Sequence, residues 1–161
     1  MANSKSWKTD LSRGQSWEGK LFFWMEGKYK NVELLSEEFG ADFSIDGKLV
    51  ELKTDFLPYH NFFIETYSNY QTKRIGGPRA ALEYGAQYFL YYFVGENSPY
   101  RWNLFSFNLE KMVSWLDKEE TFYPKRFVNN NDYDTYGCII PIRVLRNTEF
   151  CRMTKVDLSN I

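Results

Sequence analysis

The segment at residues 41–55 constrains the fold more than any other part of the chain. Apolar and polar residues alternate in it on both sides of Asp46-Gly47, which is the period of half-buried strands. Asp-Gly between two such runs is among the strongest signals for a two-residue hairpin turn. With that turn, the register places Asp42 directly opposite Glu51 on the neighbouring strand. The sequence therefore predicts a hairpin that holds two acidic side chains face to face.

Period two also separates the chemistry of the two hairpin faces. Lys53 shares a face with Asp42 and Glu51, and the reverse face carries only apolar side chains, namely those of Phe43, Ile45, Val50 and Leu52. Directly opposed like charges are destabilising, so the pair needs a compensating cation. A hard divalent ion with oxygen ligands, Mg²⁺ or Mn²⁺, is the natural partner. The alternative is a frayed Asp42 and a solvated edge formed by Glu51 and Lys53.

Such a pair predicts a particular reaction. A metal ion held by Asp42 and Glu51 can lower the pKa of a bound water and polarise a phosphoryl oxygen. Lys53 could hold the attacking water or offset the charge that develops on phosphorus. A metal ion, an activated water and a nearby positive charge are the groups that hydrolysis of a phosphodiester bond needs.

The remaining pattern indicates alternating helices and strands. Helices are expected over residues 11–25, 78–87 and 108–116, and strands over 62–67, 88–94, 101–107 and 138–145; residues 32–35 have no clear type. The order of helix, hairpin, strand, helix, strand, strand and helix predicts an α/β or α+β fold with a mixed sheet. We see no repeat and no linker, so residues 1–161 are expected to form a single domain.

Composition excludes several classes of protein. Lys and Arg number 20 against 21 Asp and Glu, so the chain has no strongly basic coat for nucleic acid, although a local basic patch is compatible with this balance. Aromatic residues make up 19%, which is too many for a disordered chain. No apolar run approaches the ~20 residues of a membrane span, and the first residues lack a signal-peptide pattern. We therefore expect a soluble, cytoplasmic protein with no membrane partner.

The hairpin motif resembles that of a known superfamily. Asp42, eight intervening residues and then Glu51-Leu52-Lys53, preceded by a predicted helix that carries Glu18, look like the motif of the PD-(D/E)xK nucleases. The run from Asn61 to Glu65 and the helix opened by Gly77-Pro78 are similar to those of small phage-type members. The resemblance covers residues 12–94, and Ala41 stands where the name of the motif has proline.

The resemblance implies a fold and a set of site residues. The fold is a restriction-endonuclease-like α/β domain, a mixed β-sheet flanked by helices with an α-β-β-β-α-β core. Asp42 and Glu51 match the metal-binding acids, Lys53 matches the catalytic lysine, and Glu18 matches an additional acid on the first helix. The implied cofactor is Mg²⁺ or Mn²⁺, the partner is DNA, and the setting is a bacterial or phage-infected host cell.

Two of the acids have alternative interpretations. Glu18 could be a surface acid near a helix N-terminus, where its charge is favourable. Glu65 lies in an otherwise apolar strand that we expect beside the strand of Glu51. It either binds the metal or supports one of the metal's ligands, because buried acids are rarely unpaired, or it faces outward.

A basic cluster is the candidate nucleic-acid contact. Lys73, Arg74 and Arg79 surround Gly76-Gly77 just before the second predicted helix. Glycine permits close backbone approach, and amides at a helix N-terminus bind phosphate well. The alternative is a solvated loop. Tyr67, Tyr70 and Tyr84 could stack on bases, although a core role is the default for aromatic residues in so aromatic a chain.

The function expected from these residues is a Mg²⁺-dependent deoxyribonuclease. One alternative is a resolvase of Holliday junctions or other branched DNA, which implies a homodimer because two strands must be cut. A second alternative, from a different class, is a non-catalytic module on the same fold that binds nucleic acid or another protein.

Overall fold

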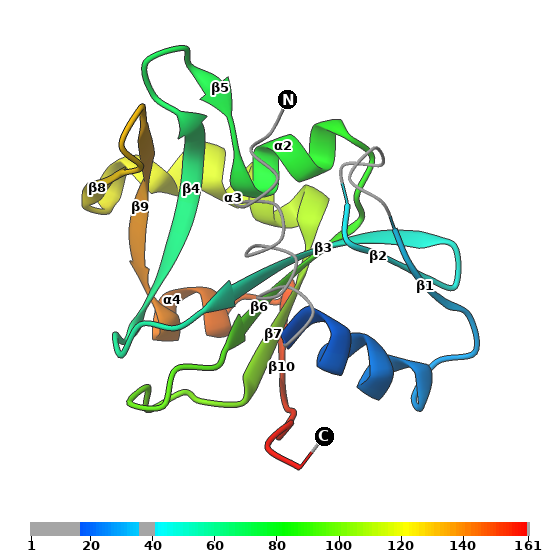
Figure 1. Ribbon diagram of the computed structural model, residues 1–161. Coiled ribbons are helices and arrows are strands. Elements are labelled where there is room, and N and C mark those ends of the chain that lie inside the picture. The colour runs from blue at the N-terminus through cyan, green and yellow to red at the C-terminus, as the bar shows by residue number, and fades with distance from the viewer. Residues whose placement is uncertain (1–16, 36–40, 161) are drawn as a thin grey trace.

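The chain folds into a mixed α/β structure with two β-sheets (Figure 1). The computed structural model describes residues 17–35 and 41–160. The first sheet has the order β1-β2-β3-β6-β7-β10, formed by Val32–Leu34, Phe43–Ile45, Lys48–Asp55, Tyr88–Phe93, Asn103–Asn108 and Cys151–Lys155. The second has the order β5-β4-β9-β8, formed by Arg74–Ile75, Asn61–Asn69, Asp134–Pro141 and Lys125–Asn129.

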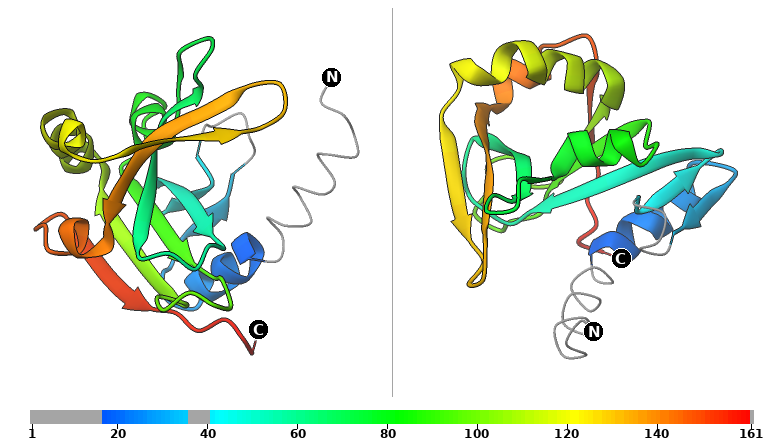
Figure 2. Two further views of the ribbon diagram at one scale, coloured as in Figure 1. Left: turned by 90° about the vertical axis from the view of Figure 1, so that its left-hand side faces the viewer. Right: turned by 90° about the horizontal axis from the view of Figure 1, so that it is seen from above.

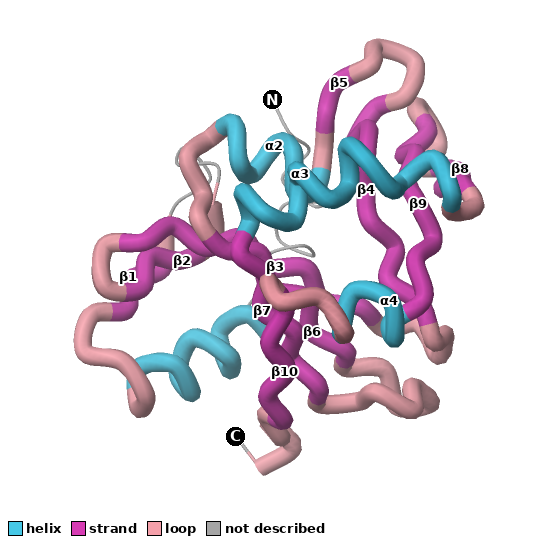
Figure 3. Tube along the Cα trace, turned by 180° about the vertical axis from the view of Figure 1, so that it is seen from behind, coloured by secondary structure: helices cyan, strands magenta, loops and turns pink. Residues whose placement is uncertain are grey.

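The helices lie on both sides of the first sheet (Figure 3). They are a helix at residues 17–26, α2 (Gly77–Glu83), α3 (Leu109–Glu119) and α4 (Ile142–Arg146), with a short 3₁₀ turn at Glu120–Phe122 after α3. Among the described residues, no helix has the length and apolar character needed to cross a membrane.

The centre of the first sheet is a parallel pair. β3 and β6 run parallel, whereas every other neighbouring pair in this sheet is antiparallel. The apolar run of β6 explains its central place, because its side chains from Phe89 to Phe93 are all buried. A strand that is apolar on both faces is stable only where both faces are covered.

Two apolar clusters cover the two faces of this sheet. On one face, Leu21 and Met25 of the helix at residues 17–26 pack with Phe43 and Val50 of the hairpin. This confirms the predicted apolar reverse face of the hairpin. On the other face, Phe62 and side chains of α2, α3 and α4 pack against β6 and β7.

The second sheet corrects one expectation. β3 pairs with β2 and β6, so the strand that carries Glu65 is not its neighbour in a sheet. Instead β4 pairs with β5 and β9 and forms a separate sheet (Figure 2). Its alternation sends Phe62 and Ile64 into the core, and this buried side lets β4 pack against the first sheet.

Several boundaries also differ from those expected. The second helix ends at Glu83 because Gly85 has a positive φ of 96°. The strand expected over residues 138–145 is instead the end of β9 followed by α4. β9 ends at Pro141, because proline has no backbone N–H to donate to a neighbouring strand. β8 and β10 were not expected, and residues 11–16 of the first predicted helix lie outside the described residues. The helix expected from residue 108 is present as α3, and Asn108 caps it, since its side chain accepts a hydrogen bond from the Lys111 amide.

The Gly76-Gly77 joint lets α2 begin in direct contact with β4. A Cβ on Gly77 would lie 2.6 Å from the carbonyl oxygen of Glu65, and its φ is +55°. A Cβ on Gly76 would lie 2.7 Å from Glu65 Oε1. The close approach that we expected of these glycines is therefore made to the strand of Glu65.

We predict opposite effects from two glycine substitutions. Gly77→Ala should lower the free energy of unfolding by about 2 kcal/mol or more, because a left-handed backbone costs about 1–2 kcal/mol and the new methyl group collides with Glu65. Gly19→Ala, in the helix at residues 17–26 with nothing within 4 Å of its Cβ, should raise it by about 1 kcal/mol. Urea denaturation followed by Trp fluorescence measures both, and effects of the same sign would contradict the packing described for the joint.

Candidate active site

The hairpin at residues 43–55 has the predicted register as far as Phe43 and Val50, where the ladder ends, so the expected direct pairing of Asp42 with Glu51 is not part of it. Ile45 pairs with Lys48 and Phe43 pairs with Val50. The turn residues Asp46 and Gly47 have φ values of 50° and 81°, and two successive positive φ angles are typical of a type I′ turn. The turn chemistry therefore sets which residues of β2 and β3 face each other.

Asp42 lies where this ladder ends. Its amide donates to the carbonyl of Val50 at 3.0 Å, and its Oδ2 accepts a hydrogen bond from the Leu52 amide at 2.7 Å. The Asp42 carboxylate thus takes the place of a backbone acceptor at the open edge of β3. This bond fixes an acid beside Glu51, the residue before Leu52.

Glu18 joins the pair from the helix at residues 17–26. Burial raises the pKa of Glu18 to about 8, with further increases from a hydrogen bond to Asp42 and from the charge of Asp42. The Glu18 carboxyl therefore lies within hydrogen-bonding reach of the Asp42 carboxylate when one of them carries a proton. A surface acid at a helix terminus would not be held in this way.

The pKa of Glu51 is raised by burial and by its acidic neighbours. Burial raises its pKa to about 8, followed by the charges of Asp42 and Glu18, a hydrogen bond with Asp42 and the charge of Glu65. We call Glu18, Asp42, Glu51 and Glu65 the carboxylate cluster. Its members come from a helix, the end of a hairpin strand, a central strand and a strand of the other sheet.

Lys53 and Glu65 complete this face. Burial raises the pKa of Glu65, and the positive charge of Lys53 opposes that shift. The Lys53 ammonium also lies 5.8 Å from the centre of the Phe63 ring, two residues before Glu65 on β4. Glu65 was expected to approach Glu51 through strand pairing, but it does so because β4 crosses the face of the first sheet.

The donor chemistry of the cluster fits a hard cation. Carboxylate oxygens are the ligands that Mg²⁺ and Mn²⁺ prefer, and the mutual repulsion of these acids would be relieved by a divalent ion. Within residues 17–35 and 41–160, no group of three or more His, Cys, Asp or Glu side chains has the spacing of a ready-made metal cage. One or two carboxylates with waters are sufficient for Mg²⁺, so Asp42 and Glu51 are the fitting pair.

A buried link that the sequence did not reveal supports the cluster. Asp55 ends β3 and is buried; its Oδ2 accepts a hydrogen bond from the Tyr91 hydroxyl. That hydroxyl in turn accepts from the Phe63 amide at 3.1 Å, while Asp55 Oδ1 accepts from the Leu57 amide at 2.8 Å. Asp55 thus caps the turn that follows β3, and its bond to Tyr91 ties β3, β6 and β4 together.

The basic cluster does not stay together in the structure. Arg79 forms salt bridges with Asp117 at 2.9 Å and with Glu120 at 3.0 Å, so it joins α2 to the C-terminal part of α3. Only 17% of its side chain is exposed, which corrects the expectation that it faces nucleic acid. Lys73 and Arg74 are exposed and form no salt bridge with a described residue. α2 is also too short for a developed N-terminal phosphate site.

Two pockets lie elsewhere on the molecule. One, of about 280 Å³, lies between the helix at residues 17–26 and the first sheet, where Trp24 and Leu90 line it. The other, of about 420 Å³, is lined by polar side chains that include Lys111 and Arg152. No residue of the carboxylate cluster lines either pocket, so the cluster lies outside both.

Comparison with known proteins identifies no relative. No family model matches the chain, and neither a curated protein nor a solved structure is significantly similar to it.

The raised pKa values predict how stability depends on pH in the absence of divalent ions. The unfolded chain releases the protons of Glu18 and Glu51 near the ordinary value of 4.5, whereas the folded protein keeps them up to about pH 8. The folded state therefore binds more protons in this range, and the free energy of unfolding should fall as the pH rises from about 4.5 to about 8.

Denaturation in EDTA across this pH range measures the effect. Glu51→Gln should reduce the slope, because one of the carboxyls that holds a proton is removed. Glu110→Gln, which changes an exposed acid on α3, should keep the slope of the wild type. Equal slopes in all three proteins would show that the carboxylate cluster does not hold protons in the folded state.

Proposed function

We propose that this protein is a Mg²⁺-dependent deoxyribonuclease that hydrolyses phosphodiester bonds at the carboxylate cluster. The observation that carries the proposal is the convergence of Glu18, Asp42 and Glu51 at a half-buried place. Burial, together with the charge and hydrogen bonding of Asp42, raises the pKa of Glu18 and Glu51 to about 8. Close, half-buried acids with strongly shifted pKa values are costly for stability. They are typical of sites where the charge has a use.

The proposal gives each residue of the site a distinct task. Asp42 and Glu51 would hold the metal ion, with Glu18 completing the acidic set. The bound ion would supply an activated water and a positive charge next to the phosphoryl group. Lys53, on the same face of β3 as Glu51, would position the water and offset negative charge on the phosphate oxygens. Glu65 lies near enough to Lys53 for the lysine charge to oppose the rise in the Glu65 pKa that burial causes.

The proposal includes a restriction-endonuclease-like arrangement. Its support is the chain order of the helix at residues 17–26, the hairpin, β4, α2 and β6, together with the Asp42, Glu51 and Lys53 motif. Two features are additional to that core order: β1 before the hairpin, and the pairing of β4 in a second sheet. The reaction rests on the motif and the carboxylate cluster.

A non-catalytic nucleic-acid-binding module is the second candidate. The observation in its favour is that no three metal-type side chains among the described residues have the spacing of a finished metal cage. Lys53 argues against it, because it shares a strand face with Glu51 and its charge acts on Glu65, and a structural site has no need for a lysine beside the acids. Binding of metal and cleavage of DNA distinguish the two.

Divalent ions should raise the melting temperature of the free protein. Because the ion binds the folded cluster and relieves its repulsion, Mg²⁺ at a hundredfold excess over its Kd should add about 2.7 kcal/mol, a shift of about 5–10 °C for a domain of this size. Asp42→Asn should abolish the shift while keeping an acceptor for the Leu52 amide.

Asp46→Asn is the matched control for this experiment. It removes a carboxylate from the turn of the same hairpin, and Asn-Gly suits that turn as well as Asp-Gly does. Differential scanning calorimetry with and without Mg²⁺ measures all three proteins. An equal shift in wild type and Asp42→Asn would place the ion elsewhere on the molecule.

Lys53→Ala should abolish most cleavage without loss of fold. Removal of one preorganised electrostatic group costs about 10²–10³ in rate, and Lys53→Arg should restore little because a guanidinium differs in shape and does not readily release its proton. Single-turnover cleavage, with DNA saturated by enzyme, separates this effect from binding. The substrates are linear duplex, single-stranded, flapped and four-way DNA, with RNA for comparison.

Lys48→Ala is the control for Lys53. Lys48 lies on the same strand but is exposed beside the turn, so its removal should leave the rate unchanged. Full activity of Lys53→Ala would refute the mechanism. Absence of cleavage by the wild type on every substrate would support the binding module.

A further inference from the structure

The free end of the second sheet carries a cluster of aromatic side chains. We call Tyr67, Tyr70, Phe127 and Tyr136 the aromatic cluster; they come from β4, the turn after it, β8 and β9 (Figure 2). The ring centres of Tyr70, Phe127 and Tyr136 lie 4.8–5.2 Å apart, and Tyr67 lies 6.1 Å from Tyr70. Phe127 remains 52% exposed. These rings pack on one another and leave aromatic surface in contact with solvent.

Positive charge accompanies this surface. The Lys73 ammonium lies 3.0 Å from the centre of the Tyr70 ring and 5.2 Å from that of Tyr67. Lys73 has a positive φ of 58°, which turns the chain sharply just before β5. Arg74 follows it, exposed and without a salt bridge to a described residue. Asp134, an acid close to this turn, accepts a hydrogen bond from Gln71 at 2.8 Å.

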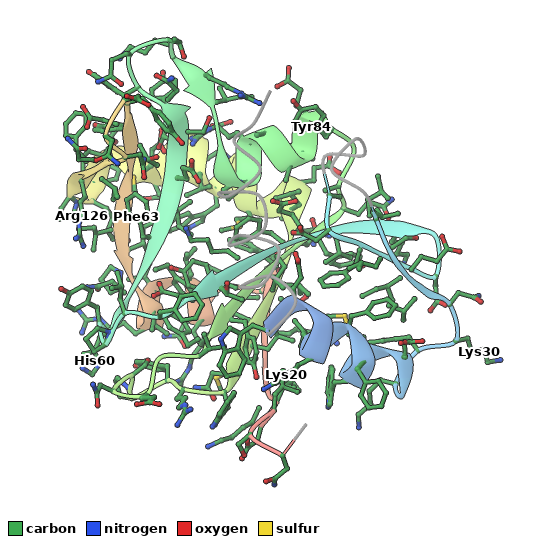
Figure 4. All side chains as sticks on the ribbon, in the orientation of Figure 1. Lys20, Lys30, His60, Phe63, Tyr84 and Arg126 are labelled. Atoms are coloured by element: carbon green, nitrogen blue, oxygen red, sulfur yellow. The ribbon has the colours of Figure 1, made fainter. Side chains whose placement is uncertain are left out.

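Aromatic faces beside lysine and arginine fit a particular ligand. Bases of single-stranded nucleic acid stack on exposed rings, and the phosphates between them pair with nearby cations. A purely apolar partner would not match Lys73 and Arg74. Tyr84, the third tyrosine considered for stacking, lies at the end of α2 away from the second sheet (Figure 4), so it is not part of this surface.

The position of the aromatic cluster distinguishes a single strand from a duplex. Glu65 pairs with Gly137, whereas Tyr67 pairs with Tyr136, because a bulge shifts the register between them. Neighbouring residues of β9 point to opposite faces, so Glu65 and Tyr67 also lie on opposite faces of the second sheet. The Cα atoms of Glu65 and Tyr67 are two residues apart on one strand, a distance of about 7 Å. A duplex is too stiff to pass round a sheet edge over that distance, whereas a single strand is flexible enough.

We infer that the aromatic cluster binds a single-stranded DNA segment that leads away from the carboxylate cluster. The inference rests on the proposed nuclease function and names its substrate class, which is DNA with an unpaired strand next to the cleavage site. A base stacks on the exposed Phe127 ring, and Lys73, held over Tyr70, and Arg74 contact the neighbouring phosphates. Base stacking of this kind carries no sequence preference of its own.

Binding in EDTA tests the inference apart from cleavage. The probes are a fluorescent oligothymidylate, an abasic oligonucleotide of the same length and a duplex of the same length. Phe127→Ala should weaken binding of oligothymidylate about five- to a hundredfold, the range of base–aromatic stacking, and leave binding of the abasic strand unchanged. Lys73→Ala should weaken binding of both single strands and lower the salt dependence.

Phe23→Ala is the matched control. Phe23 is 65% exposed on the helix at residues 17–26, so its removal deletes a comparable ring from another surface. The affinity of the Phe23→Ala variant for every probe should equal that of the wild type. Thermal unfolding of each variant verifies the fold.

Several outcomes overturn the inference. An equal loss for Phe127→Ala on the oligothymidylate and the abasic strand would exclude stacking, and tighter binding of duplex than of single strand would exclude the substrate class. A change in sedimentation of the free protein on Phe127→Ala, with no change in affinity for oligothymidylate, would assign the surface to self-association. Binding as described, without cleavage when Mg²⁺ is added, would support the single-strand surface while refuting the nuclease activity.

Discussion

The hydrogen bond from the Leu52 amide to the Asp42 carboxylate is the interaction on which the site depends. It replaces the last rung of the hairpin and uses an acidic side chain as the acceptor. Without it, β3 would have an unpaired donor at its half-buried edge, and such a donor costs about 1–3 kcal/mol. The same bond holds Asp42 beside Glu51, so a requirement of the sheet produces the repulsion that characterises the site.

The hairpin was predictable from the sequence because the information is local. Asp46-Gly47 sets the turn, the turn sets the register, and the alternation sets which face is apolar. The cap at Asn108 and the buried strand at Tyr88–Phe93 follow from equally local patterns. The placement of β4 does not follow from a local pattern. Its alternation fits either an added strand in the first sheet or a strand of a second layer packed upon that sheet. Only its packing against the first sheet decides between the two.

The proximity of the candidate acids was predictable from the sequence, whereas the residues that surround them were not. Glu18, Asp42, Glu51 and Lys53 were chosen by a motif and its spacing, and the structure brings the three acids together. Arg79 was assigned to nucleic acid because it follows Lys73 and Arg74 in the chain. Its partners Asp117 and Glu120 are distant in sequence, so no local pattern indicated that it would join two helices. The residues of the aromatic cluster come from four segments of the chain. In a sequence so rich in aromatic residues, no local pattern distinguished these four from residues of the core.

The parallel pairing of β3 with β6 also determines the order in which this molecule can assemble. The hairpin that brings Asp42 to Glu51 closes over a two-residue turn, and hairpins form within microseconds. β6 joins β3 only after the intervening chain, with β4 and α2, has been placed, and β10 reaches β7 from still further along the sequence. Contacts of such long range form slowly. We therefore expect the acids of the hairpin to meet early in folding, and Glu65 and the buried bond between Asp55 and Tyr91 to be placed later.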